Sequence, residues 1–171
     1  DRVFKKEIEL LAEKFSYKLL YLSVDVFSAY ITAQQFFKPP LDQGILIWKI
    51  DKNNFHYFTF YENNNLSSFI SFRISKKSFK IYQEIGLDKT NDMLKNFILT
   101  VLIKKKKSNE INNIFVYQSK NNFKYIKEYV NNEKLNINLL DMSPIFNDKV
   151  NNMYNFLPYV ENGISLKGID V

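Results

Sequence analysis

The side chains that could do chemistry in this chain are few and widely spaced. His56 is the only histidine, so a catalytic histidine pair and a metal site of several histidines are both excluded. It lies in a run of aromatic residues, which favours a structural role. Because the chain has no cysteine, disulfides and thiolate metal sites are excluded as well.

Serine and glycine patterns exclude two further kinds of site. The serines are scattered, and none lies in a Gly-x-Ser-x-Gly motif. Neither common kind of glycine-rich phosphate loop is present. Asn65-Leu66-Ser67 fits a glycosylation acceptor, but nothing else in the sequence indicates secretion. Residue chemistry alone therefore assigns no function.

Composition indicates one folded domain with a sizeable core. The 171 residues are 46% hydrophobic and 16% aromatic, which is too apolar for a disordered chain. No run of 18 apolar residues is present, so no membrane-spanning segment is expected. The N-terminus has neither an apolar signal core nor an initiating Met, and we expect the chain to be an excised fragment.

The net charge of +6 allows two interpretations. It could mark a partner that is a nucleic acid or an anionic membrane surface. It could equally follow from the Lys-, Asn- and Ile-rich composition that an AT-rich genome produces. The one dense basic run, residues 104–107, is expected at a solvated helix end, where cations are favourable.

The elements that would position any site are organised around three consecutive strands. β-branched and aromatic residues fill runs at 45–50, 55–61 and 66–74, and Asn-rich turns at 51–54 and 62–65 separate them. Connections this short permit only antiparallel hairpins. The stretch 75–85 is polar and is expected to be a connection.

Helices and further strands are expected on either side of this meander. Before it, a helix at 2–15, an apolar strand at 17–24 and a helix from Asp25 form a leader that Pro39-Pro40 ends. The elements expected after it are a helix at 90–104, a strand at 111–117, a helix from Lys120, a strand at 135–140 and a helix from Asp148.

The element order from Ile45 predicts the fold class. It reads β-β-β-α-β-α-β-α, and right-handed crossovers give a mixed sheet of strand order 3-2-1-4-5. This is the ribonuclease-H-like arrangement of an α/β protein. We expect a helix-strand-helix leader at 1–40 and a ribonuclease-H-like subdomain at 41–171. Nucleases, sugar kinases, chaperone ATPases and actins share this arrangement, so the fold does not select a function.

Nuclease activity is not expected. It requires carboxylates that converge on two metal ions, one of them from within the first strand, and the only ionisable residue there is Lys49. Asp51 and Glu62 lie at turns, where such residues are ordinary turn formers. The aromatic residues of the second strand could stack bases, but core packing is the favoured interpretation. These residues are Phe55, Tyr57, Phe58, Phe60 and Tyr61.

Four segments resemble the C-terminal half of the PilM family of actin-like ATPases, to which GspL and FtsA are related. The first is 4–37, in which a helix precedes an apolar strand that ends in a Val-Asp pair, and the helix that follows starts with small residues, here within 24–29. The second is the three strands from Ile45, with Arg73 after the third. The third is 139–146, which is similar to a strand that enters an Asn-Pro-Phe-like turn. The fourth is 163–168, Gly-Ile-Ser-Leu-Lys-Gly, which is similar to a closing Gly-Leu-Ala-Leu-Arg-Gly.

The nucleotide motifs of this family are degenerate here. Lys49 stands where the resemblance implies an acid that helps to organise Mg²⁺, and Asp51 stands where it implies a glycine. Asn53 and Asn54 complete this equivalent of the phosphate loop. Gln118 and Ser119 stand where a Gly-Gly pair makes room for adenosine.

The resemblance therefore implies a non-catalytic actin-like scaffold of a type IV pilus or type II secretion platform at the bacterial inner membrane. We expect it on the cytoplasmic face, bound to the cytoplasmic tail of a membrane protein or to an assembly ATPase. No catalytic residue, metal or cofactor is expected, although weak ATP and Mg²⁺ binding and a homodimer stay open. Nucleic acid is not an expected partner.

Two alternatives remain open from the sequence. The chain could belong to an active ATPase or kinase whose nucleotide is held mainly by a missing N-terminal half, with Asp25 or Asp51 essential. It could also bind single-stranded nucleic acid through its charge and aromatic residues, with the steep salt dependence that such binding has.

Overall fold

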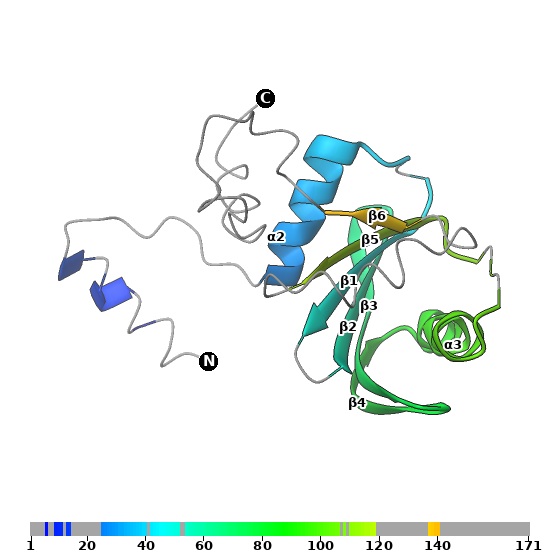
Figure 1. Ribbon diagram of the computed structural model, residues 1–171. Helices are drawn as coiled ribbons and strands as arrows, with labels where there is room; N and C mark the ends of the chain where they lie inside the picture. Colours follow the sequence, from blue (N-terminus) through cyan, green and yellow to red (C-terminus); the bar gives the residue numbers. More distant parts are fainter. Residues whose placement is uncertain are drawn as a thin grey trace, which may run out of the picture.

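The molecule is built on a six-stranded mixed sheet with helices on both faces (Figure 1). The computed structural model describes residues 6, 9–11, 13–14, 25–40, 42–51, 54–106, 108, 110–118 and 137–140. The helical elements are α2 (Asp25–Thr32) with the π-helical turn η1 (Ala33–Phe37), and α3 (Asp88–Phe97) with the π-helical turn η3 (Ile98–Ile103). The strands are β1 (Ile45–Asp51), β2 (Phe55–Glu62), β3 (Asn65–Ser75), β4 (Ser78–Gly86), β5 (Asn113–Gln118) and β6 (Ile137–Leu139).

The strands lie in the order β4-β3-β2-β1-β5-β6. Neighbours from β4 to β1 are antiparallel, whereas β5 is parallel to β1 and β6 is parallel to β5. The five strands expected from the sequence keep the predicted order 3-2-1-4-5 within this sheet. The arrangement is compatible with the ribonuclease-H-like prediction, but it has one additional strand at an edge of the sheet.

That edge is formed by β4, and the prediction of a connection at 75–85 is wrong. Phe79 and Ile81 point toward the core, while Lys80 and the residues after Ile81 are exposed. An edge strand meets water on one side, so it carries polar residues that resemble a loop in sequence. The tight turn before it contains neither Gly nor Asn, and Ser75 Oγ donates instead to the carbonyl oxygen of Ser78 at 3.1 Å. β3 is therefore an interior strand, paired with β4 from Ser68 to Ser75.

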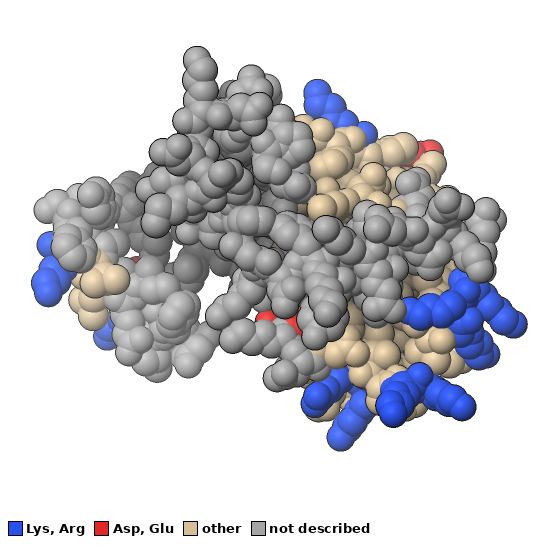
Figure 2. Space-filling view, viewed as in Figure 1, with Lys and Arg blue, Asp and Glu red and all other residues tan. Residues whose placement is uncertain are grey.

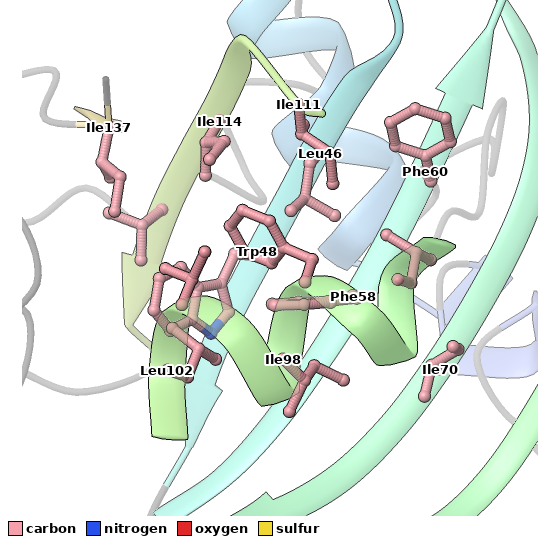
Figure 3. Close-up of a cluster of buried hydrophobic side chains, with 14 of the residues drawn as sticks. Leu46, Trp48, Phe58, Phe60, Ile70, Ile98, Leu102, Ile111, Ile114 and Ile137 are labelled. Atoms are coloured by element: carbon pink, nitrogen blue, oxygen red, sulfur yellow. The ribbon is translucent and has the colours of Figure 1, made fainter. Parts of the chain in front are cut away.

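The larger core lies between the sheet and α3–η3 (Figure 3). β1 and β2 contribute large side chains to it at alternate positions, as a period of two requires. The helix contributes the stripe that the sequence predicted, and all five of its residues are buried: Leu94, Phe97, Ile98, Val101 and Leu102. The sheet side includes Leu46, Trp48, Ile50, Phe58, Phe60, Ile70 and Phe72.

The opposite face of the sheet carries a smaller core beneath α2. Tyr30 of α2 stacks on Tyr61 of β2, with ring centroids 3.7 Å apart and nearly parallel planes. The Tyr30 hydroxyl donates to Asn64 Oδ1 at 2.9 Å, and Gln34 Nε2 donates to the same oxygen at 2.7 Å. These contacts fix the helix to the β2–β3 turn, where Asn64 has a left-handed backbone.

Polar contacts hold the start of α3 against β3 and β4. Ser67 and Thr90 share a hydrogen bond of 3.1 Å, and Ser68 donates to Asn91 Oδ1. Lys95 Nζ lies 2.5 Å from Glu84 Oε1 of β4, and this hydrogen bond raises the pKa of Lys95. The helix is therefore tied to the edge strand as well as to the core.

Several predicted elements lie outside the described residues. They are the strand at 17–24, the helix from Lys120 and the helix from Asp148, and the division at residue 40 stays a prediction. Of the helix expected at 2–15, residues 6, 9–11 and 13–14 are described, and all six are helical. No helix in the described part of the chain is long and apolar enough to cross a bilayer.

Replacement of Gly86 by alanine is expected to destabilise the fold. Gly86 has a φ of +122°, and a Cβ there would overlap the backbone of Ser67 and lie 2.7 Å from Ser68 Cα. Backbone strain of this kind costs about 1–3 kcal/mol. Urea unfolding followed by the fluorescence of Trp48, the only tryptophan, measures the loss.

Gln83→Ala, an exposed position on the same strand, is the matched control. We expect it to change the unfolding free energy by no more than about 0.5 kcal/mol. A Gly86→Ala variant as stable as this control would show that the backbone at the end of β4 is not constrained as described.

Candidate functional site

Four of the residues that the sequence analysis assigned to equivalents of the two nucleotide loops lie where β1 and β5 end: Lys49, Asp51, Asn54 and Gln118. Lys49 and Asp51 lie at the carboxyl end of β1, and Gln118 ends β5, where it pairs in register with Ile50. Asn54 immediately precedes β2, the next strand of the hairpin. Asn53 and Ser119 lie outside the described residues. The carboxyl ends of adjacent parallel strands are where open α/β sheets bind ligands, so this is the candidate site.

The ammonium group of Lys49, at the carboxyl end of β1, contacts an aromatic ring. Lys49 and Tyr57 are cross-strand partners, and the Lys49 ammonium lies 5.2 Å from the centroid of the Tyr57 ring. An ammonium over a ring face is attracted by its quadrupole. Because a cation cannot ligate Mg²⁺, this position does not supply the carboxylate that a nucleotide-bound metal uses.

A hydrogen-bond chain that starts in the core crosses the same hairpin on its other face and ends at the exposed Asn54. Trp48 Nε1–H donates to His56 Nδ1 at 3.0 Å, and His56 Nε2 lies 3.1 Å from Asn54 Oδ1. Asn54 Nδ2 in turn donates to the carbonyl oxygen of Ile74 at 3.2 Å. Since Nδ1 accepts, the neutral ring carries its proton on Nε2 and donates to Asn54. The chain thus joins β1, β2 and β3 and requires a neutral imidazole.

The surroundings of His56 keep it neutral. Its side chain is fully buried and stacks on Phe72, with ring centroids 5.1 Å apart. Desolvation by burial lowers its pKa from 6.5 to about 4. This environment agrees with the structural role that the aromatic strand predicted, and it removes the one histidine from general acid–base chemistry at neutral pH.

Aromatic residues of β2 divide between the two faces of the sheet. Phe58, Phe60 and Tyr61 are buried, as the core-packing interpretation predicts. Phe55 and Tyr57 are only half-buried and lie on the face that carries α2, beyond the reach of the smaller core. The sequence pattern could not separate these two groups, because every residue of the run is apolar or aromatic except His56 and Thr59.

Few ionisable groups gather anywhere in the described part of the chain. Among those residues, no group of three or more His, Cys, Asp or Glu side chains lies close enough to hold a metal ion. The strongly shifted phenol, Tyr61, has its pKa raised by burial and by neighbouring Tyr30, and it belongs to the packing beneath α2.

Comparison with known proteins adds a partial likeness of shape. No family model matches the chain, and no curated protein matches it. One solved structure, that of MreB5 of Spiroplasma citri bound to ADP, aligns with 98% of this chain at 11% identity and a TM-score of 0.46. The chain spans 65% of the length of that protein. Because a TM-score below 0.5 is too low to assign a fold, the fold rests on the strand order and register described above.

NMR of the single histidine tests the hydrogen-bond chain directly. We expect the His56 imidazole of the folded protein to titrate with a midpoint near pH 4, with Nδ1 as the unprotonated nitrogen at neutral pH. The urea-unfolded chain is the control, where the same ring should titrate at about 6.5. A folded-state midpoint near 6.5 would contradict the burial of His56 and its hydrogen bond from Trp48.

Proposed function

We propose that the chain is a non-catalytic binding domain of the actin-like, ribonuclease-H-like type. One observation carries the proposal: the carboxyl end of β1 presents Lys49 against the Tyr57 ring, at the position where the resemblance implies a metal-organising acid. Asp51 beside it adds negative charge where phosphate would lie. A hairpin built in this way supports attachment to a partner better than phosphate transfer.

The finer assignment follows the resemblance alone. It is a scaffold of a type IV pilus or type II secretion platform, peripheral to the cytoplasmic face of the inner membrane. Its partner in this proposal is the cytoplasmic tail of a membrane protein or an assembly ATPase. A neighbouring gene for an inner-membrane protein of the pilus type would support this assignment, and an isolated gene would count against it.

A thermal melt with and without millimolar ATP and Mg²⁺ tests the non-catalytic proposal. A ligand that binds only the folded state at 100 times its Kd adds about 2.7 kcal/mol to the unfolding free energy. In a chain of this size each kcal/mol raises the Tm by about 2–4 °C. We expect no rise in Tm beyond that given by Mg²⁺ alone.

Variants at the end of β1 identify the source of any rise. A rise that Asp51→Ala or Lys49→Ala abolishes would show that this hairpin holds nucleotide and would overturn the proposal. A rise only in a longer protein with an additional N-terminal half would favour the alternative of an ATPase or kinase, and ATP turnover by that protein would then decide against the scaffold.

A further inference from the structure

Three aromatic rings and two lysines form a continuous row on the sheet face beyond α2. The Tyr57 and Phe55 centroids are 5.1 Å apart, and those of Phe55 and Tyr82 are 5.0 Å apart. Lys49 Nζ lies 5.2 Å from the Tyr57 ring at one end, and Lys80 Nζ lies 5.3 Å from the Tyr82 ring at the other. We call these five residues the aromatic strip.

The register of the strands brings the aromatic strip together. Asp51 pairs with Phe55, Phe55 with Arg73, and Arg73 with Lys80, so one row crosses β1 to β4 on a single face. The β3–β4 pairing shifts between Ser71 and Phe72, and Tyr82 is the additional residue on β4. A bulge redirects a side chain, and here the Tyr82 ring reaches Phe55.

The aromatic strip is open to solvent at its β4 end. Tyr82 is 50% exposed, and Ile85 on the same strand is 64% exposed. Among the described residues, α2 packs at the other end of this face, against Ile45, Ile47 and Tyr61. In Figure 1, β4 lies at the edge of the sheet far from α2. An exposed ring that continues a row of aromatic side chains is typical of a binding surface, and Tyr82 contacts Phe55 in this way.

The charges around the aromatic strip are mainly positive. Among the described residues of this row, Lys49, Arg73 and Lys80 are positively charged and Asp51 is negatively charged. Figure 2 shows further Lys and Arg side chains along the margin that β4 and α3 occupy. A surface of this kind complements a partner that combines carboxylates with apolar side chains.

The geometry favours a peptide over a nucleic acid. The ring planes are tilted by 45° and 42° to their neighbours, so they do not present one flat platform for stacked bases. Two of the rings already have an ammonium over a face. Apolar side chains pack against tilted rings without these costs.

We propose that the aromatic strip binds an extended acidic segment of a protein partner. Its apolar side chains pack on Phe55 and Tyr82, and its carboxylates pair with Arg73, Lys80 and Lys49. This inference rests on the proposed binding function and specifies the surface and the chemistry of the partner.

A labelled synthetic peptide that alternates Glu and Leu is the probe, and fluorescence anisotropy measures its affinity. We expect Arg73→Glu combined with Lys80→Glu to weaken binding about tenfold or more, because both carboxylate partners are reversed in charge. Tyr82→Ala should weaken binding without any change in charge. Lys104→Glu with Lys106→Glu, the same charge change at exposed residues beyond η3, is the matched control and should have little effect.

Three results would overturn the inference. They are the absence of peptide binding at millimolar concentration, an equal loss in both charge-reversed pairs, and an oligo-dT strand that binds more tightly than the peptide and depends on Tyr82. None of them bears on nucleotide binding. If the peptide fails while ATP and Mg²⁺ also leave the Tm unchanged, the aromatic strip is excluded as the docking surface and the non-catalytic proposal stands.

Discussion

The hydrogen bond from Trp48 to His56 is the constraint on which the centre of this structure depends. Both side chains are fully buried, and the bond exists only while the imidazole is neutral. Burial of an unpaired polar group costs about 1–3 kcal/mol, so donor and acceptor must be buried together. His56 also contacts Asn54, and Asn54 donates to the carbonyl oxygen of Ile74 in β3. The hydrogen-bond chain therefore fixes the turn of the β1–β2 hairpin against β3.

Because the Trp48–His56 bond lies on one face of the sheet, the two faces have different roles. One face is committed to packing around Trp48 and beneath α3, and it holds His56 in its neutral form. The other face places Lys49, Tyr57 and Phe55 where α2 does not reach, next to Tyr82 of the edge strand. The side chains on the second face that do not pack in either core are therefore the ones that can bind a partner.

The sequence correctly predicted the elements that hydrophobic periodicity and turn residues determine. It missed the features that depend on contacts between strands. The three strands from Ile45, the stripe from Leu94 to Leu102 and the order of five strands depend on local patterns, and these agree with the structure. β4 was missed because an edge strand with one wet side resembles a polar loop. The aromatic strip was missed because register and the bulge at Tyr82, rather than composition, bring its rings together.

The unfolding free energy as a function of pH, compared between the wild type and His56→Asn, tests the central constraint most directly. Asn can accept from Trp48 but does not titrate. With a folded pKa of about 4 against 6.5 unfolded, His56 stabilises the fold fully above pH 6.5, and this stabilisation is lost as the pH falls to 4. We predict that the stability of the wild type relative to the variant rises by about 3 kcal/mol from pH 4 to 6.5 and is then flat. A difference independent of pH would contradict the account.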